Sequence, residues 1–151
     1  MNRDLFEKGK QRWLPTDPSS PQAWERAQES YLTAARAAYE TRAKELLDEL
    51  KTLEIKYSHK NLSRQERKRA VDCIADYYQV MVNAQLFDGV NNSIAMAQVN
   101  FMLHRFGYEP IEHRRLDYLA YISPTPVMRR VFHKVIDERG YPLSHFPRFF
   151  F

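Results

Sequence analysis

The sequence holds one cysteine, only four glycines and no long uncharged apolar run. The single Cys73 excludes a disulfide within the chain and suits a reducing compartment, where we expect it to be a small buried helix residue. Few glycines and few β-branched runs argue against a β fold. No stretch reaches the roughly 20 apolar residues that cross a bilayer, and no apolar core of a signal peptide follows Met1. We therefore expect a single domain without a transmembrane segment.

The chain also lacks the short motifs that carry common chemistries. It contains no H-E-x-x-H, no glycine-rich phosphate loop, no Gly-x-Ser-x-Gly and no cysteine pair. His59, His133 and His145 have no partners at the spacing of metal ligands. Asp72 and Asp76 would share a helical face, either as an acid–base pair or as carboxylates in solvent or neutralised by the bases just before them, and we adopt the second interpretation. We expect no enzymatic activity, no cofactor and no metal.

The longest regular stretch runs from residue 22 to about residue 58, without glycine or proline. Ser20 and Pro21 are typical of a helix start. A straight helix of roughly 35 residues measures about 50–55 Å, whereas a compact domain of this length is roughly 40 Å across. The helix therefore either breaks near residues 41–42 or extends past its domain along another protein, and we favour the second. Its heptad-like seam comprises Trp24, Tyr31, Ala35, Ala38, Tyr39, Ala43, Leu46, Leu50, Leu53 and Tyr57.

A helical hairpin is predicted for residues 63–107. Ser63 and Glu66 have the spacing of a capping box before an apolar run. The turn at residues 87–89 contains Gly89, which accepts positive φ. The helix after it carries apolar residues nearly all round, so we expect it to be buried on most sides. Gly107 is a natural end for that helix.

Two shorter helices are predicted after the hairpin, over residues 112–122 and 127–139. Thr125 is expected to cap the second of them and Pro126 to lie in its first turn. The fold class is therefore all-α, with one long N-terminal helix, a helical hairpin and two shorter helices. We divide the chain into an irregular N-terminal extension (1–20), a helical domain (21–140) and an extended aromatic tail (141–151).

Positive charge gathers between residues 56 and 69, where Glu66 alone opposes it. Several of these cations stand at a predicted helix start, where the helix macrodipole disfavours each by roughly 0.3–1 kcal/mol. Three interpretations stay open: a solvated face, contact with an acidic protein or lipid surface, or contact with nucleic-acid phosphates. The aromatic side chains of both extensions either fold back or dock on a neighbour. The predicted partner-binding residues are Lys56, Lys60, Arg64, Arg67, Lys68, Arg69, Trp13, Phe146, Phe149, Phe150 and Phe151.

A short pattern recurs in the second half of the chain. Gly107-Tyr108 and Gly140-Tyr141 each close a predicted helix, 33 positions apart, with a proline nearby. This spacing is similar to that of the tetratricopeptide and pentatricopeptide repeats. The pentatricopeptide resemblance implies binding of single-stranded RNA.

Residues 85–93 resemble the signature of the Fic family of nucleotidyl-transferring proteins. Phe87 and Asn91 match it, and a helix of similar length follows, ending in Gly-Tyr. Gln85 occupies the position of the family's catalytic histidine, and Ser93 that of its phosphate-binding arginine. The resemblance therefore implies a degenerate member without the family's chemistry.

These observations favour a non-catalytic accessory subunit of a larger intracellular assembly, which binds neighbouring protein subunits through the long helix and the terminal extensions. A pI near 9.2 and a small size favour a mitochondrial complex. The alternative is an RNA-binding helical-repeat protein or a ribosome-associated subunit, with RNA or an anionic lipid surface as partner. A degenerate Fic-like protein is the third hypothesis.

Overall fold

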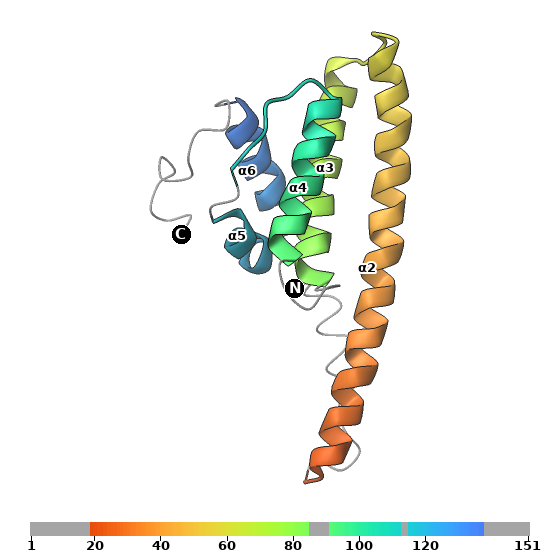
Figure 1. The fold of residues 1–151 in the computed structure, drawn as a ribbon, viewed down its shortest axis with the longest axis vertical. Coiled ribbons are helices and arrows are strands. Elements are labelled where there is room, and N and C mark those ends of the chain that lie inside the picture. Colours follow the sequence, from red (N-terminus) through yellow and green to blue (C-terminus); the bar gives the residue numbers. More distant parts are fainter. Residues whose placement is uncertain (1–18, 85–90, 113–114, 138–151) are drawn as a thin grey trace.

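The computed structural model describes residues 19–84, 91–112 and 115–137, and helices account for most of them (Figure 1). No strand occurs within these ranges, which confirms the all-α prediction. The predictions for Trp13, for the turn at residues 87–89 and for the aromatic tail, including Phe146, Phe149, Phe150 and Phe151, lie outside the described residues. The helices are α2 (Pro21–Ser58), α3 (Arg64–Ala84), α4 (Asn91–Arg105), α5 (Leu116–Ile122) and α6 (Thr125–Asp137).

The helix boundaries follow local signals in the sequence. Ser20 caps α2 by accepting a hydrogen bond from the amide of Ala23, at 3.3 Å. Ser63 and Glu66 form the predicted capping box: the Glu66 amide donates to the Ser63 hydroxyl, and the Ser63 amide donates to the Glu66 carboxylate. Gly107 ends α4 with φ of +78°, as predicted, because a residue with a Cβ is strained in this conformation. Capping thus fixes three of the helix ends.

Two boundaries differ from the predictions. The helix expected from residue 112 begins only at Leu116. The helix expected at residue 127 begins at Thr125, so Thr125 is not the cap. The carbonyl of Pro124 accepts the first helical bonds, and the Thr125 hydroxyl donates to the side chain of Gln79, at 3.0 Å. Tertiary contact therefore replaces the capping role expected for this hydroxyl.

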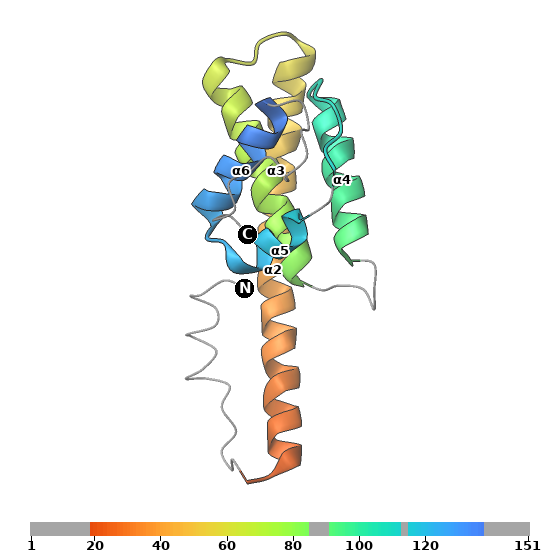
Figure 2. The same ribbon diagram turned by 90° about the vertical axis from the view of Figure 1, so that its left-hand side faces the viewer.

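The core of the structure is built around α3, which packs against α2, α4, α5 and α6 (Figure 2). α4 lies on one side of α3 and buries a single face, although the sequence predicted burial on most sides. Phe101, at the middle of its outer face, is 65% exposed. The prediction was wrong because the described helices leave the outer side of α4 uncovered. The buried face of α4 comprises Ala95, Met96, Val99 and Leu103.

None of the described helices combines sufficient length with sufficient hydropathy to span a bilayer. Most of the apolar side chains of α3 and α6 face the core. The ring of Tyr78 lies in the middle of the core, 5.6 Å from that of Phe132 between centroids. The Tyr78 hydroxyl is buried and has no hydrogen-bond partner among the described residues, and burial raises its pKa.

Replacing Tyr78 by Phe is expected to leave the free energy of unfolding unchanged or to raise it by about 1 kcal/mol, because a buried hydroxyl without a partner costs stability. Tyr77→Phe is the matched control. The Tyr77 hydroxyl donates to Gln98 at 3.0 Å, so its removal should cost about 0.5–1.5 kcal/mol. Urea denaturation of both variants measures the difference. Equal losses in the two variants would show that the Tyr78 hydroxyl is hydrogen-bonded.

Candidate functional site

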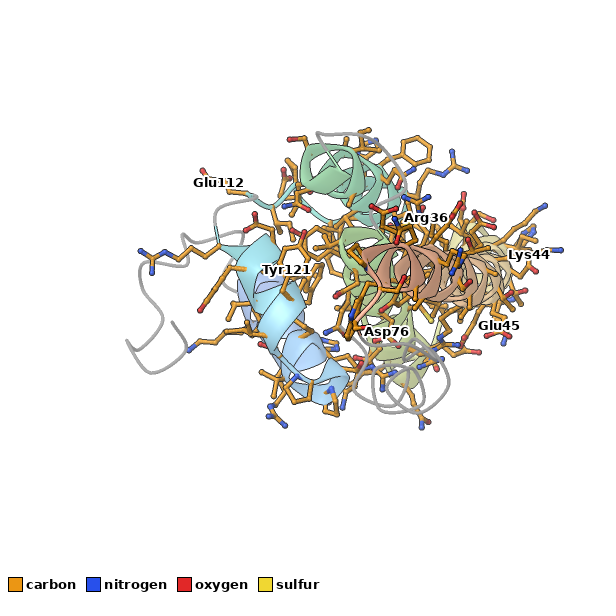
Figure 3. All side chains as sticks on the ribbon, turned by 90° about the horizontal axis from the view of Figure 1, so that it is seen from below. Arg36, Lys44, Glu45, Asp76, Glu112 and Tyr121 are labelled. Atoms are coloured by element: carbon orange, nitrogen blue, oxygen red, sulfur yellow. The ribbon has the colours of Figure 1, made fainter. Side chains whose placement is uncertain are left out.

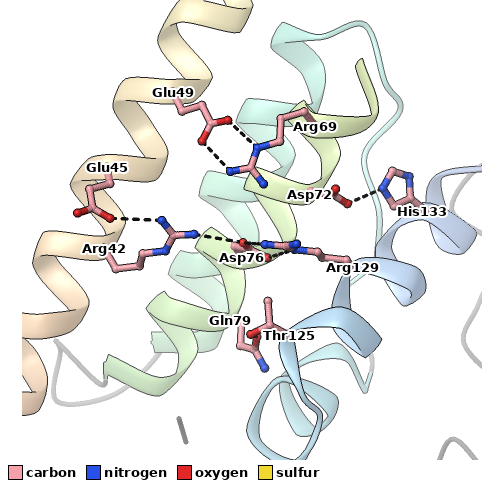
Figure 4. Close-up of polar contacts among 10 residues, drawn as sticks. All are labelled: Arg42, Glu45, Glu49, Arg69, Asp72, Asp76, Gln79, Thr125, Arg129 and His133. Carbon is pink, nitrogen blue, oxygen red and sulfur yellow. Dashed lines mark hydrogen bonds and ion pairs between the residues drawn. The ribbon is translucent and has the colours of Figure 1, made fainter. Parts of the chain in front are cut away.

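A buried carboxylate joins three helices at the centre of the molecule. Asp76 on α3 is only 4% exposed. The guanidinium of Arg129 on α6 binds it through two hydrogen bonds, of 2.8 and 2.5 Å, and that of Arg42 on α2 approaches it to 3.5 Å (Figure 4). Hydrogen bonding to Asp76 raises the pKa of Arg129. A buried charge requires such partners, so this cluster holds α2 and α6 to α3.

A second ion pair lies one to two turns away. Arg69 donates to Glu49 on α2 through its Nε and a terminal nitrogen, at 2.6 and 2.8 Å (Figure 4). The hydrogen bond lowers the pKa of Glu49 and raises that of Arg69. Arg69 was predicted to bind a partner, and that prediction is untested. Its guanidinium is already bound to a carboxylate within the chain, so few of its hydrogen-bond donors remain for an external partner.

Asp72 also turns towards α6. Its carboxylate lies 2.8 Å from the ring of His133, in the same close-up (Figure 4). The sequence-based interpretation put both carboxylates of α3 in solvent or against nearby bases, and the structure corrects it. Their partners come from residues 53 and 61 positions away. The only sequence signal was the presence of two acids on the apolar face of a helix.

The basic residues of the 56–69 stretch lie at the turn between α2 and α3, at the top of Figure 1. Lys56 is paired with Glu66 across this turn. Arg69 is paired with Glu49. None of the four remaining lysines and arginines forms an ion pair with a described residue, and all four are exposed. We call this set the basic tip; it comprises Lys60, Arg64, Arg67 and Lys68.

A pocket of about 370 Å³ opens at the basic tip. Arg67 lies over the ring of Tyr57, with its guanidinium carbon 5.7 Å from the ring centroid. The other side of Tyr57 contacts Phe106, 5.8 Å away between ring centroids. Lys60 has φ of +56°, so it belongs to the turn itself and not to either helix. The lining consists of Tyr57, Ser58, Lys60, Leu62 and Arg67.

The opposite end of α2 extends past the other described helices in both ribbon views (Figures 1 and 2). α2 has 38 residues and continues without a break through Thr41. No described side chain between residues 24 and 45 is buried, whereas Leu46, Leu50 and Leu53 are. We call residues 24–41 the projecting half. Trp24, near its start, is 48% exposed.

Two kinds of reactive group can be assessed among the described residues, a metal site and the cysteine. No three of their histidines, cysteines and carboxylates converge as a metal site. Cys73 is buried as predicted, and burial raises its pKa to about 12, which keeps the thiol protonated and unreactive. The tip pocket is lined by cations, a hydroxyl and apolar atoms, a set suited to holding an anion.

A comparison of the chain with protein families, curated proteins and solved structures finds no match in any of the three. The resemblances to helical repeats and to the Fic family gain no support from it. Residues 85–90, on which the Fic resemblance mainly depends, lie outside the described part of the chain, as does Gly140.

Replacing Asp76 by Asn is expected to lower the free energy of unfolding by about 2–4 kcal/mol, because it removes the buried member of the ion pair and leaves the half-buried Arg129 without its counter-charge. Glu45→Gln is the matched control. Glu45 binds the same Arg42, but on the surface at 3.3 Å, so its loss should stay within about 0.5 kcal/mol. Chemical denaturation measures both. Equal effects of the two substitutions would contradict the role given to Asp76.

Acid should weaken the turn between α2 and α3. The Lys56 ammonium, followed by the Ser63 amide, lowers the pKa of Glu66 from 4.5 to about 2. The unfolded chain therefore takes up a proton before the folded chain does, and the contribution of Glu66 is lost as pH falls from about 4.5 to 2. The melting temperature of the wild type should exceed that of Glu66→Gln above this interval, and the gap should close within it. A gap independent of pH would contradict the prediction.

Proposed function

We propose that this protein is a non-catalytic helical accessory subunit, which binds a neighbouring protein subunit of a larger assembly through the projecting half of α2. In this arrangement a long N-terminal helix, a helical hairpin and two shorter helices form the body, and the terminal extensions add contacts. The observation that carries the proposal is the length of α2 beyond the bundle (Figure 1). We keep an intracellular and preferably mitochondrial setting as part of the proposal.

A helix that packs against no neighbour gains little stability from its own residues. Isolated helices of this length are marginal in water, because most helix stability in proteins comes from packing of an apolar face. In the projecting half no described side chain is buried, so packing of such a face is incomplete there. A partner helix packed along it would supply the missing contacts.

The composition of the projecting half suits a helical partner. It contains five alanines, which allow a second helix to approach closely. Ala35 and Ala38 are half-buried and lie on the seam that continues to Leu46 and Leu50, whereas Ala34 and Ala37 are exposed on other sides. The seam therefore continues from the core into the projecting half, which favours a coiled-coil contact.

Charge on the projecting half also fits a protein partner. Glu25, Glu29 and Glu40 alternate with Arg26 and Arg36, so the surface carries both signs. Mixed charges beside an apolar seam are typical of helix pairing, where they select the partner and its orientation. A surface for a polyanion would instead carry one sign, as the basic tip does.

Hydrogen exchange tests this proposal. In the isolated full chain, amides of residues 24–41 should exchange about tenfold or more faster than those of residues 46–57 in the same helix, because they lack tertiary cover. In the assembly purified from its native source they should become protected. An isolated monomer that protects residues 24–41 as well as residues 46–57 would show that the chain covers this helix itself.

Paired substitutions locate the contact. Ala35→Glu with Ala38→Glu should abolish co-purification of the partner, whereas Ala34→Glu with Ala37→Glu should not. Glutamate and alanine are both good helix formers, so both variants should keep the helix. The melting temperature of the isolated chain serves as the control for folding. Equal losses of partner from both variants would contradict a contact along the seam.

A further inference from the structure

The two ends of α2 differ in chemistry. The projecting half has mixed charge, whereas the basic tip has four exposed cations that no described carboxylate neutralises. The tip is formed by the turn after α2 and by the first two turns of α3. The capping acid, Glu66, is already bound to Lys56 and to the Ser63 amide. The remaining positive charge therefore faces solvent without compensation from the described chain.

Local stability does not explain this cluster. Arg64, Arg67 and Lys68 follow the N-terminus of α3, where the macrodipole is positive and cations are unfavourable. They lie at positions i, i+3 and i+4, which places them on one face of the helix. Lys60 extends the same charge into the turn. An external anion with several negative groups in a row would meet all four.

We propose that the basic tip binds the phosphate backbone of a single-stranded nucleic acid, with the pocket between Lys60 and Arg67 receiving one phosphate. The Ser58 hydroxyl lines this pocket too. It donates to the carbonyl of Ile55, at 2.8 Å, so its oxygen remains an acceptor and the positive side chains supply the attraction. The pocket lies at the low end of the size range of ligand sites, about 300–1,000 Å³, which suits one phosphate with part of its sugar.

Arg67 favours a nucleic acid over other polyanions. Its guanidinium carbon lies over the Tyr57 ring and the side chain is exposed, so the planar guanidinium is accessible for stacking on an unpaired base. An anionic membrane would also meet the cations, but it would favour large apolar side chains beside them. Of the strongly exposed large apolar side chains among the described residues, only Ile55 lies within residues 55–69, and one such side chain is little for insertion into a membrane.

The test uses the full chain and a fluorescein-labelled oligouridylate of about 12 nucleotides, within the site sizes of known single-strand binders. Fluorescence anisotropy measures the dissociation constant between about 50 and 200 mM salt. The tip variant carries Lys60→Gln, Arg64→Gln, Arg67→Gln and Lys68→Gln. The control variant removes four exposed cations elsewhere, with Lys44→Gln, Lys51→Gln, Arg130→Gln and Lys134→Gln. Lys44, for example, points away from the bundle (Figure 3).

The wild type is expected to lose affinity with salt at a slope of about −3 in log K against log salt, because four phosphate contacts contribute about −0.7 each. The tip variant should bind at least about tenfold more weakly at the lowest salt, with a slope near zero. The control variant should keep the wild-type slope. Circular dichroism confirms that all three chains are equally helical.

A conservative substitution separates charge from stacking. Arg67→Lys keeps the positive charge, so the salt slope should not change. It removes the planar guanidinium, so affinity should fall about two- to fivefold. A salt slope that becomes shallower together with the loss of affinity would contradict the stacking role.

Three results would overturn the proposal. The first is equal weakening by the tip and control variants, which would mean that only net charge matters. The second is no measurable binding of the oligouridylate at low salt. The third is binding of the wild type to phosphatidylserine vesicles without binding to the oligouridylate, which would make the tip a lipid contact. None of these results affects the partner proposed for the projecting half, because that contact is tested by different residues.

Discussion

The structure depends on how α3 accommodates a charge in its buried surface. α3 touches all four other described helices, and most of its residues beyond the first two turns are apolar and buried. Asp76 interrupts that surface. A buried carboxylate requires cations beside it, and these come from opposite sides, Arg129 on α6 and Arg42 on α2. The position of this single side chain thereby restricts how both helices align along α3.

The neighbouring polar contacts repeat this arrangement along α3. Arg69 reaches α2 and Asp72 reaches α6. Gln79 donates to the carbonyls of Ala120 in α5 and of Ser123 just after it, at 3.2 and 2.7 Å. Apolar packing alone would tolerate sliding of one helix past another. Directional bonds at successive turns do not, since a shift by one turn would leave a buried polar group without a partner.

Much of this fold could be predicted from the sequence because helix ends are local. Ser20, Ser63 with Glu66, and Gly107 act through backbone groups within a few residues, so their roles follow from spacing alone. The contacts of Asp72 and Asp76 could not be predicted, because their partners lie 34, 53 and 61 positions away in the sequence. The error for α4 has the same origin: an apolar pattern shows which residues can be buried, while the number of neighbours decides which of them are.

The candidate site could likewise be predicted only in part. The sequence places six cations within 14 positions, but it does not show which are engaged inside the chain. Only the folded arrangement pairs Arg69 with Glu49 and Lys56 with Glu66, and so separates structural charges from exposed ones. The projecting half is easier to predict from the sequence, because counting residues already shows that the helix is longer than its own domain.

α2 links two surfaces that lie at opposite ends of one rod. With 38 residues it measures about 57 Å, so anything held at its first turns and anything held at its last turns are kept apart by most of that length. The rod also fixes the direction in which each surface faces, since successive residues of an α-helix are rotated by about 100° around its axis. A natural length variant that inserts or removes a single residue near Thr41 would therefore swing one surface around the axis by more than a quarter turn relative to the other. Changes of seven residues, close to two full turns, would alter the reach and nearly preserve the direction.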